Sequence, residues 1–256
     1  MENRTAKNFY DSLDLTHDRL NSYLPQLFEG LWELGSMPQY IIDLIERNHI
    51  RAQGSQVLDL GCGKGSVLIN LAMNYDVQGT GMDVVPEFIE EAQAYAKTYG
   101  VEDKLNFRTE NLLETIHKTS SQDMVIYGYD SEILGDLATT INYLSGCIKD
   151  NRVMVIEFIV ALRPTEGMLT DQAMMDTLKE CPYTMLDRID WDVETLRQVN
   201  QKNTRIIARN IQQLTLQYPN MKKIFMDYLE NQKTECSYME NDCTCTTILL
   251  GAGRDG

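Results

Sequence analysis

The chain has 256 residues, of which 43% are hydrophobic and 24% charged, and its formal net charge at pH 7 is −15. This length and composition suit one large globular domain, or one domain with an insertion, that buries a full core. The excess of acids disfavours nucleic acids and anionic membranes, whose phosphates carry the same charge, and favours a small-molecule partner.

The acidic composition can also serve solubility alone. The cysteines and the shortness of the apolar runs favour a cytoplasmic location. The six cysteines form no C-x-x-C pair, which indicates free thiols in a reducing compartment. The first ten residues lack the apolar core of a signal peptide. The longest apolar run, 153–162, is interrupted by an acid and is too short to cross a bilayer. We therefore expect a cytoplasmic protein with no membrane segment.

The first 50 residues are expected to form a helical arm or lid ahead of the main domain, 51–256. Leucines between positions 20 and 34 recur at helical spacing, and glycines interrupt the pattern, which indicates broken helices. A helix over about 38–48 then leads into the first strand.

The first strand, 56–60, contains one acid, Asp59, and is followed by glycines at positions 61, 63 and 65. A helical pattern comes next, so this stretch is a strand, a tight loop and a helix start. Glycines let a ligand approach main-chain N–H groups. The dinucleotide fingerprint is G-x-G-x-x-G, whereas the spacing here is G-x-G-x-G. An acid beside the loop suits a cationic ligand, so a nicotinamide-dependent oxidoreductase is disfavoured.

The second strand ends in another acid, Asp83, 24 positions after Asp59. One strand–helix–strand unit separates the two acids, and neighbouring parallel strands end side by side, where ligands bind. A carboxylate there can accept from both hydroxyls of a ribose.

The segment V-L-D-L-G-C-G-K-G, Val57–Gly65, together with Asp83, resembles the cofactor motifs of class I methyltransferases that use S-adenosylmethionine (SAM). The likeness covers about residues 40–160 and extends loosely to the small-molecule group that includes ubiquinone-pathway methyltransferases. It implies an α/β fold with a doubly wound, mostly parallel, seven-stranded sheet of the Rossmann-like type. It also implies SAM as the cofactor.

The same resemblance implies how the cofactor is held. Asp59, Gly61 and Gly63 would bind the amino-acid end of SAM, and Asp83 its ribose. Val84 and Val85 would pack against the adenine. Asn111 stands where the family usually has an acid, and its carbonyl oxygen can accept from the adenine amino group. The main-chain N–H of Leu112 would serve an adenine ring nitrogen. A glycine-rich turn without a ligand is the alternative.

Strands and helices alternate through the rest of the first two thirds of the chain, which predicts a parallel sheet with helices on both faces. The expected strands are 105–109, 124–127 and 152–160, and the expected helices are 87–99 and 131–148.

Candidate catalytic residues follow the fourth strand and lie within the fifth. Methyl transfer depends mainly on alignment and exclusion of water, so no catalytic triad is expected. Tyr127, Tyr129 and Asp130 are candidates for cofactor or substrate contact, with aromatic packing and a helix N-cap as alternatives. Glu157 interrupts an apolar strand, where a buried charge is costly. We expect it to bind a substrate amine or act as a base, unless it is an edge-facing or ion-paired acid.

The last third departs from the simple alternation. A helix over 171–179 and a strand over 183–189 precede a helical insertion, 191–231, and a final strand, 243–250. The resemblance implies that the last two strands are antiparallel at the sheet edge. Helices inserted there commonly roof a substrate pocket. A scaffold or a homodimer surface is the alternative.

No metal site is expected. The three histidines lack metal-ligand spacing. Cys243 and Cys245 share one face of a strand, which favours core filling over a thiolate site that also uses Cys236.

The sequence therefore predicts a SAM-dependent methyltransferase acting on a small molecule. A non-catalytic module that binds SAM or its demethylated product, or a partner subunit, is the second interpretation. The acceptor, the methylated atom and the oligomeric state stay open.

Overall fold

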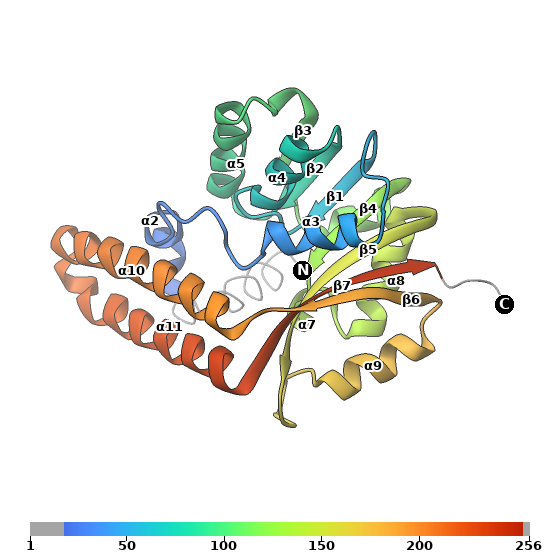
Figure 1. Cartoon of the computed structure of the whole chain (residues 1–256). Helices are drawn as coiled ribbons and strands as arrows, with labels where there is room; N and C mark the ends of the chain where they lie inside the picture. The colour runs from blue at the N-terminus through green and yellow to red at the C-terminus, as the bar shows by residue number, and fades with distance from the viewer. Residues whose placement is uncertain (1–17, 253–256) are drawn as a thin grey trace.

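The computed structural model describes residues 18–252 and contains one seven-stranded sheet in the order β3-β2-β1-β4-β5-β7-β6 (Figure 1). Successive parallel pairings join β3 through to β5, and β7 runs antiparallel to both β5 and β6. The predicted doubly wound sheet with an antiparallel last strand is confirmed. The strands are β1 (Gln56–Leu60), β2 (Gln78–Asp83), β3 (Leu105–Thr109), β4 (Gln122–Gly128), β5 (Ile148–Ala161), β6 (Tyr183–Asp190) and β7 (Cys243–Ala252).

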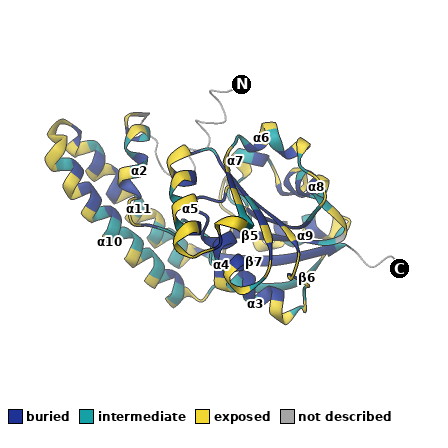
Figure 2. Ribbon diagram, turned by 90° about the horizontal axis from the view of Figure 1, so that it is seen from above, coloured by how far each residue is buried: buried dark blue, intermediate teal, exposed yellow. Residues whose placement is uncertain are grey.

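Helices cover both faces of this sheet, as predicted (Figure 1). One face packs against α3 (Pro38–Arg47), α4 (Ser66–Asn74) and α5 (Pro86–Thr98). The other packs against α8 (Leu137–Cys147) and α9 (Asp171–Glu180). Short helices α6 (Leu112–Thr115) and α7 (Ser131–Leu134) follow β3 and β4, and the 3₁₀ turns η2 (Glu102–Lys104) and η3 (Ile116–Lys118) join elements. Buried residues concentrate in the strands, while the outer helix faces are exposed (Figure 2).

The helical insertion is a long hairpin of α10 (Val193–Gln217), the turn η4 (Pro219–Met221) and α11 (Lys222–Asp242). It therefore continues to 242, beyond the predicted end at 231, because α11 runs into β7 without a loop. The hairpin extends from one end of the sheet (Figure 1). It shares a separate core with η1 (Asp18–Tyr23), α2 (Leu24–Leu27) and the start of α5. Asn210 of α10 connects the hairpin to the N-terminal arm by donating to the carbonyls of Leu27 (3.0 Å) and Glu29 (2.8 Å).

Two further predictions of element bounds are wrong. The expected helix over 131–148 is broken into α7 and α8, because Gly135 adopts φ +87° and Asp136 caps the second helix by accepting from the Thr139 N–H at 2.8 Å. Strand β5 begins at Ile148 rather than at 152. The predicted lid falls partly within residues 1–17, which lie outside the described residues.

Candidate functional site

A cavity of about 350 Å³ opens at the carboxyl ends of β1, β2, β4 and β5. Its walls also include the segment 33–37 and residues of α10. The predicted site residues that line it are Asp59, Gly61, Asp83, Val84, Asn111, Leu112, Tyr127, Tyr129, Asp130 and Glu157. Residues from five strands and loops are thus gathered around one space, which is large enough for a small ligand.

The loop after β1 is shaped by its glycines. Gly61 adopts φ +73° and lines the cavity, and a Cβ there would meet nothing within 4 Å, so a ligand can approach closely. Its N–H donates to the Met82 carbonyl at 2.8 Å. Gly65 adopts φ +74°, and a Cβ there would lie 2.6 Å from the ring of Phe107. Gly63 does not line the cavity, because Leu34 covers it and its N–H donates to Asp83 at 2.9 Å. Gly63 therefore supports the loop through Asp83 in this structure.

Asp59 is 4% exposed, and its Oδ2 atom has no hydrogen-bond partner among the described residues. Burial, and then the negative charges of Glu157 and Asp83, raise the pKa of Asp59 to about 8. A buried carboxylate oxygen without a donor is costly, and a bound cation would relieve that cost.

Asp83 lies on the neighbouring strand and is also 4% exposed. Its two oxygens accept from the main-chain N–H groups of Gly63 (2.9 Å) and Val85 (3.0 Å). Burial raises the pKa of this carboxyl to about 6, although these hydrogen bonds oppose the rise. A carboxylate oxygen has two acceptor positions, so each can still receive one hydroxyl. The two predicted acids thus line one cavity.

Asn111 ends the segment after β3 and caps α6, since its Oδ1 accepts from the Leu113 N–H at 3.0 Å. One of the two acceptor positions on that oxygen is therefore used within the chain. The other is available to a ligand amino group. Val84 and Leu112 also line the cavity and are apolar, whereas Val85 is buried in the core that the arm shares with the hairpin.

The residues after β4 combine structural contacts with a place in the cavity wall. Tyr127 is 2% exposed, and its hydroxyl donates to the Asp130 carbonyl at 3.4 Å. Asp130 caps α7 by accepting from the Glu132 N–H at 2.8 Å. The Tyr129 ring packs against Phe158 with centroids 5.3 Å apart. The two tyrosines thus make packing contacts and Asp130 is a helix cap, and all three residues also line the cavity.

Glu157 lies on β5 between β4 and β7, so the interpretation as an edge-facing acid is wrong. It is 7% exposed, and its Oε1 accepts from the Thr247 hydroxyl (3.2 Å) and the Met37 N–H (3.4 Å). Oε2 has no partner, and no ion pair involves this residue among the described residues. Burial raises the pKa of Glu157, although contacts with the Ser36 hydroxyl, the Met37 N–H and the Thr247 hydroxyl oppose the rise.

Sequence reasoning missed Lys64, which stands between two loop glycines. Its ammonium group is fully buried, pairs with Glu91 at 2.8 Å and donates to the Phe28 carbonyl at 2.8 Å. The Trp32 indole N–H donates to the Lys64 carbonyl at 3.2 Å. Lys64 therefore fastens the arm to the loop. The sequence showed a lysine there but gave no sign of the distant carbonyl that it binds.

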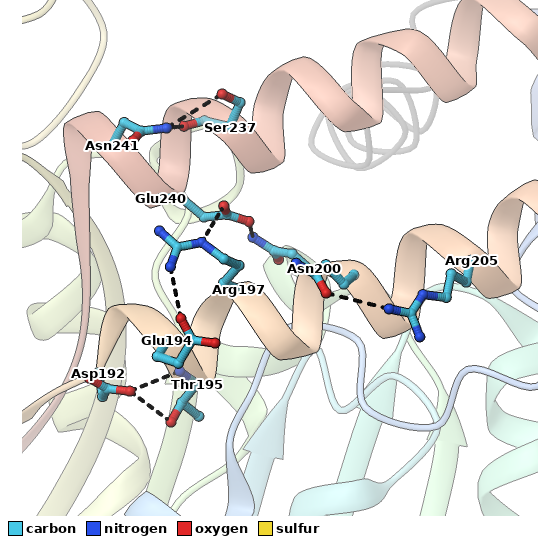
Figure 3. A network of polar contacts seen from close by, with 10 residues as sticks. Asp192, Glu194, Thr195, Arg197, Asn200, Arg205, Ser237, Glu240 and Asn241 are labelled. Carbon is cyan, nitrogen blue, oxygen red and sulfur yellow. Dashed lines mark hydrogen bonds and ion pairs between the residues drawn. The ribbon is translucent and has the colours of Figure 1, made fainter.

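The sequence predicted that the helical insertion roofs the pocket, but it did not identify which residues of the hairpin line it. Leu196, Val199, Asn200 and Asn203 of α10 and Met239 of α11 line the cavity. Glu240 of α11 joins the two helices by accepting from Asn200 (3.0 Å) and Arg197 (3.4 Å), as Figure 3 shows. This network holds the base of the hairpin beside the cavity.

No group of three or more metal-ligating side chains is assembled within residues 18–252. Cys243 and Cys245 are free and buried, in agreement with core filling, and Cys236 is free and half-buried on α11. No helix in the same range is both long and apolar enough to cross a membrane. Tyr10 and Asp11, which the resemblance would place in the N-terminal lid, and His17, a candidate base there, lie outside the described residues.

The sequence of this chain is similar to those of known methyltransferases. A family model described as a methyltransferase domain matches residues 51–244. Norajmaline N-methyltransferase from Rauvolfia serpentina is 34% identical over 70 residues, which are 27% of this chain and 24% of that protein. Ubiquinone biosynthesis O-methyltransferase from Rickettsia felis is 31% identical over 122 residues, 47% of this chain and 48% of that protein. The chain thus spans from about a quarter to half of the length of these relatives.

Among solved structures, a SAM-dependent methyltransferase from Geobacter sulfurreducens in complex with S-adenosylhomocysteine (SAH) has the same fold. The TM-score is 0.77 at 17% identity, and the match covers 91% of this chain and 98% of that one. The predicted Rossmann-like methyltransferase fold is therefore confirmed.

Proposed function

This chain belongs to the methyltransferase domain family, and we propose that it transfers a methyl group from SAM to a small-molecule acceptor. The observation that carries the proposal is the pair of buried acids, Asp59 and Asp83, on neighbouring strands at one cavity. The partnerless oxygen of Asp59 fits a ligand that brings its own positive charge.

The residues that would hold SAM follow from what each can offer. Asp59 and the open main chain of Gly61 suit the ammonium end. Asp83 suits the ribose hydroxyls. Val84, Asn111 and Leu112 suit the adenine, with Asn111 accepting from its amino group. When bound, SAM supplies a methyl group on a positively charged sulfur.

The chain's own contribution to the reaction is alignment and shelter from water. The end of β4 and Glu157 form the wall beyond the cofactor residues, and α10 forms the roof. Tyr127, Tyr129 and Asp130 would fix the shape of this end, since their side chains are held by packing or capping. The arm, held by Lys64 and Asn210, would act as the lid of the cavity.

The proposal is tested by calorimetric titration with SAH, followed by methyl transfer from labelled SAM to a mixture of small metabolites. We expect a dissociation constant in the micromolar range and label in a small product. Asp83→Ala should weaken SAH binding about 100-fold, the loss of roughly two charge-assisted hydrogen bonds. Glu180→Gln, an exposed acid at the end of α9, is the control.

Three outcomes separate the interpretations. Binding of SAH with label transfer supports the enzyme. Binding of SAH without transfer to any metabolite would indicate the non-catalytic module instead. Heat on titration with NAD but not with SAH would contradict the proposal.

A further inference from the structure

Glu157 is held in place by a chain of hydrogen bonds that uses only one of its two oxygens. The Trp191 indole N–H donates to the Thr247 hydroxyl at 3.0 Å, and that hydroxyl donates to Glu157 Oε1 at 3.2 Å. The Met37 N–H donates to the same oxygen at 3.4 Å. The side chain is therefore oriented from three elements, while Oε2 is buried in the cavity wall without a partner. An oriented, partnerless acceptor is suited to a donor on a ligand.

The space beside Glu157 is open because its neighbour on β4 is a glycine. Gly128 pairs with Glu157 in the sheet, and a Cβ there would meet nothing within 4 Å. Its φ is not in the left-handed region, so the backbone does not require glycine. The missing side chain thus leaves room between the glycine loop and Glu157.

The charge of the cavity wall restricts which ligands can bind beside Glu157. Its charged side chains are all acids among the described residues, with no lysine, arginine or histidine: Glu33, Asp59, Asp83, Asp130 and Glu157. SAM brings two positive groups and one carboxylate, so its net charge is positive. In the ligand-free protein Asp59 keeps its proton up to about pH 8, and Asp83 and Glu157 are the other buried acids of the wall. A second negative ligand would be repelled, whereas a second cation would be attracted.

Much of the remaining wall is apolar, although Asn200 and Asn203 of α10 also line the cavity. Phe158 and Trp191 bound it on the sheet side, and Leu196, Val199 and Met239 bound it on the hairpin side. Such walls accommodate an aliphatic or aromatic body. A ligand that satisfies both the walls and Glu157 has an apolar body and a positively charged nitrogen.

We propose that the acceptor is a primary or secondary amine on an apolar body, bound through its nitrogen by Glu157 Oε2. Thr247 and Trp191 act as positioning residues. This inference rests on the proposed function and names the acceptor class.

Proton balance follows from the same contact. The bound ammonium gives one proton to Glu157, and the freed lone pair forms the N–C bond while the electron pair of the broken C–S bond stays on sulfur. The amine leaves as a methylated ammonium. Burial raises the pKa of Glu157, which makes its carboxylate a better proton acceptor than an exposed one.

The test compares three probes of one shape: benzylamine, benzyl alcohol and benzoate. Each is titrated calorimetrically into the protein with and without saturating SAH. We expect benzylamine to bind at least about 10-fold more tightly than benzyl alcohol, because one charge-assisted hydrogen bond contributes about that much affinity. We expect benzoate not to bind. With labelled SAM, only the amine should become labelled.

Variants separate the nitrogen contact from general damage. Glu157→Gln should remove the preference for the amine and leave SAH affinity within about 3-fold of the wild type. Gly128→Val should block the amine without lowering the melting temperature, because the new side chain enters open space. Thr247→Val should reduce the preference, and Thr247→Ser should restore it, since serine keeps the hydroxyl.

Two results would overturn the inference: equal affinity for benzylamine and benzyl alcohol in the wild type, or a full amine preference in Glu157→Gln. Failure of SAH to bind would instead count against the proposed function. The amine preference measured without SAH still tests the inference in that case.

Discussion

Replacing Asp59 with asparagine should make the ligand-free protein more stable at neutral pH. The carboxyl is 4% exposed, and its environment holds the pKa near 8, against a usual value of 3.8. Well below the usual pKa of 3.8 the group is protonated in both folded and unfolded chains, and it costs nothing. As the pH rises toward 8, the unfolded chain gives up the proton while the folded chain keeps it. The free energy of unfolding therefore falls through this window.

The size of the effect follows from the difference between the two pKa values. Each pH unit between them is worth about 1.4 kcal/mol. From pH 4 to pH 7, Asp59 should therefore cost the folded protein of the order of 4 kcal/mol, and only about 1.5 kcal/mol at pH 5. Asparagine carries no charge and avoids this cost. Asp83 and Glu157 are present in both proteins, so the difference between them isolates Asp59.

Urea unfolding of the wild type and of Asp59→Asn at pH 5 and pH 7 measures the effect. We expect the advantage of the variant to grow by about 2–3 kcal/mol between the two pH values. Asp103→Asn, an exposed acid in η2, is the control and should show no such growth. A constant difference, or a variant that is less stable at pH 7, would refute the reasoning.

Three further substitutions test other parts of the structure, each by urea unfolding. Asp83→Ala should cost about 1–3 kcal/mol, because two buried N–H groups lose their acceptor; an unchanged midpoint would contradict this. Gly65→Ala should cost several kcal/mol, since its Cβ would lie 2.6 Å from a ring carbon, whereas Gly100→Ala shares the positive φ but meets nothing and should cost only about 1 kcal/mol. Lys64→Met should cost about 1–3 kcal/mol, because the Phe28 carbonyl keeps the Leu31 N–H but loses a charged donor and Glu91 loses its ion-pair partner. It should also speed proteolysis of the arm; equal cleavage rates would contradict a role of Lys64 in holding the arm to the loop.

Much of the fold was predictable because the pattern of strands and helices is local. The bounds of β1 and β3 agree with the sequence prediction. β1 is a short, mostly apolar run, and β3 alternates apolar and polar residues up to its end. The meeting of Asp59 and Asp83 followed from parallel topology alone, because both residues end or nearly end neighbouring strands. Such juxtapositions need only the order of elements along the chain.

What could not be predicted depends on contacts between distant segments. Leu34 covers Gly63, and Lys64 reaches the carbonyl of Phe28, yet neither contact leaves a mark on local periodicity. The orientation of Glu157 depends on Thr247, which is 90 positions away. The sequence marked the acid as unusual, but only the packed sheet shows which of its oxygens lacks a partner.

The most direct test of the central claim is electron density for SAM in a crystal of this protein. We expect the ammonium group within hydrogen-bond distance of Asp59, and at least one ribose hydroxyl on Asp83. Density for SAM elsewhere, or a cavity that stays empty at millimolar SAM, would contradict the account.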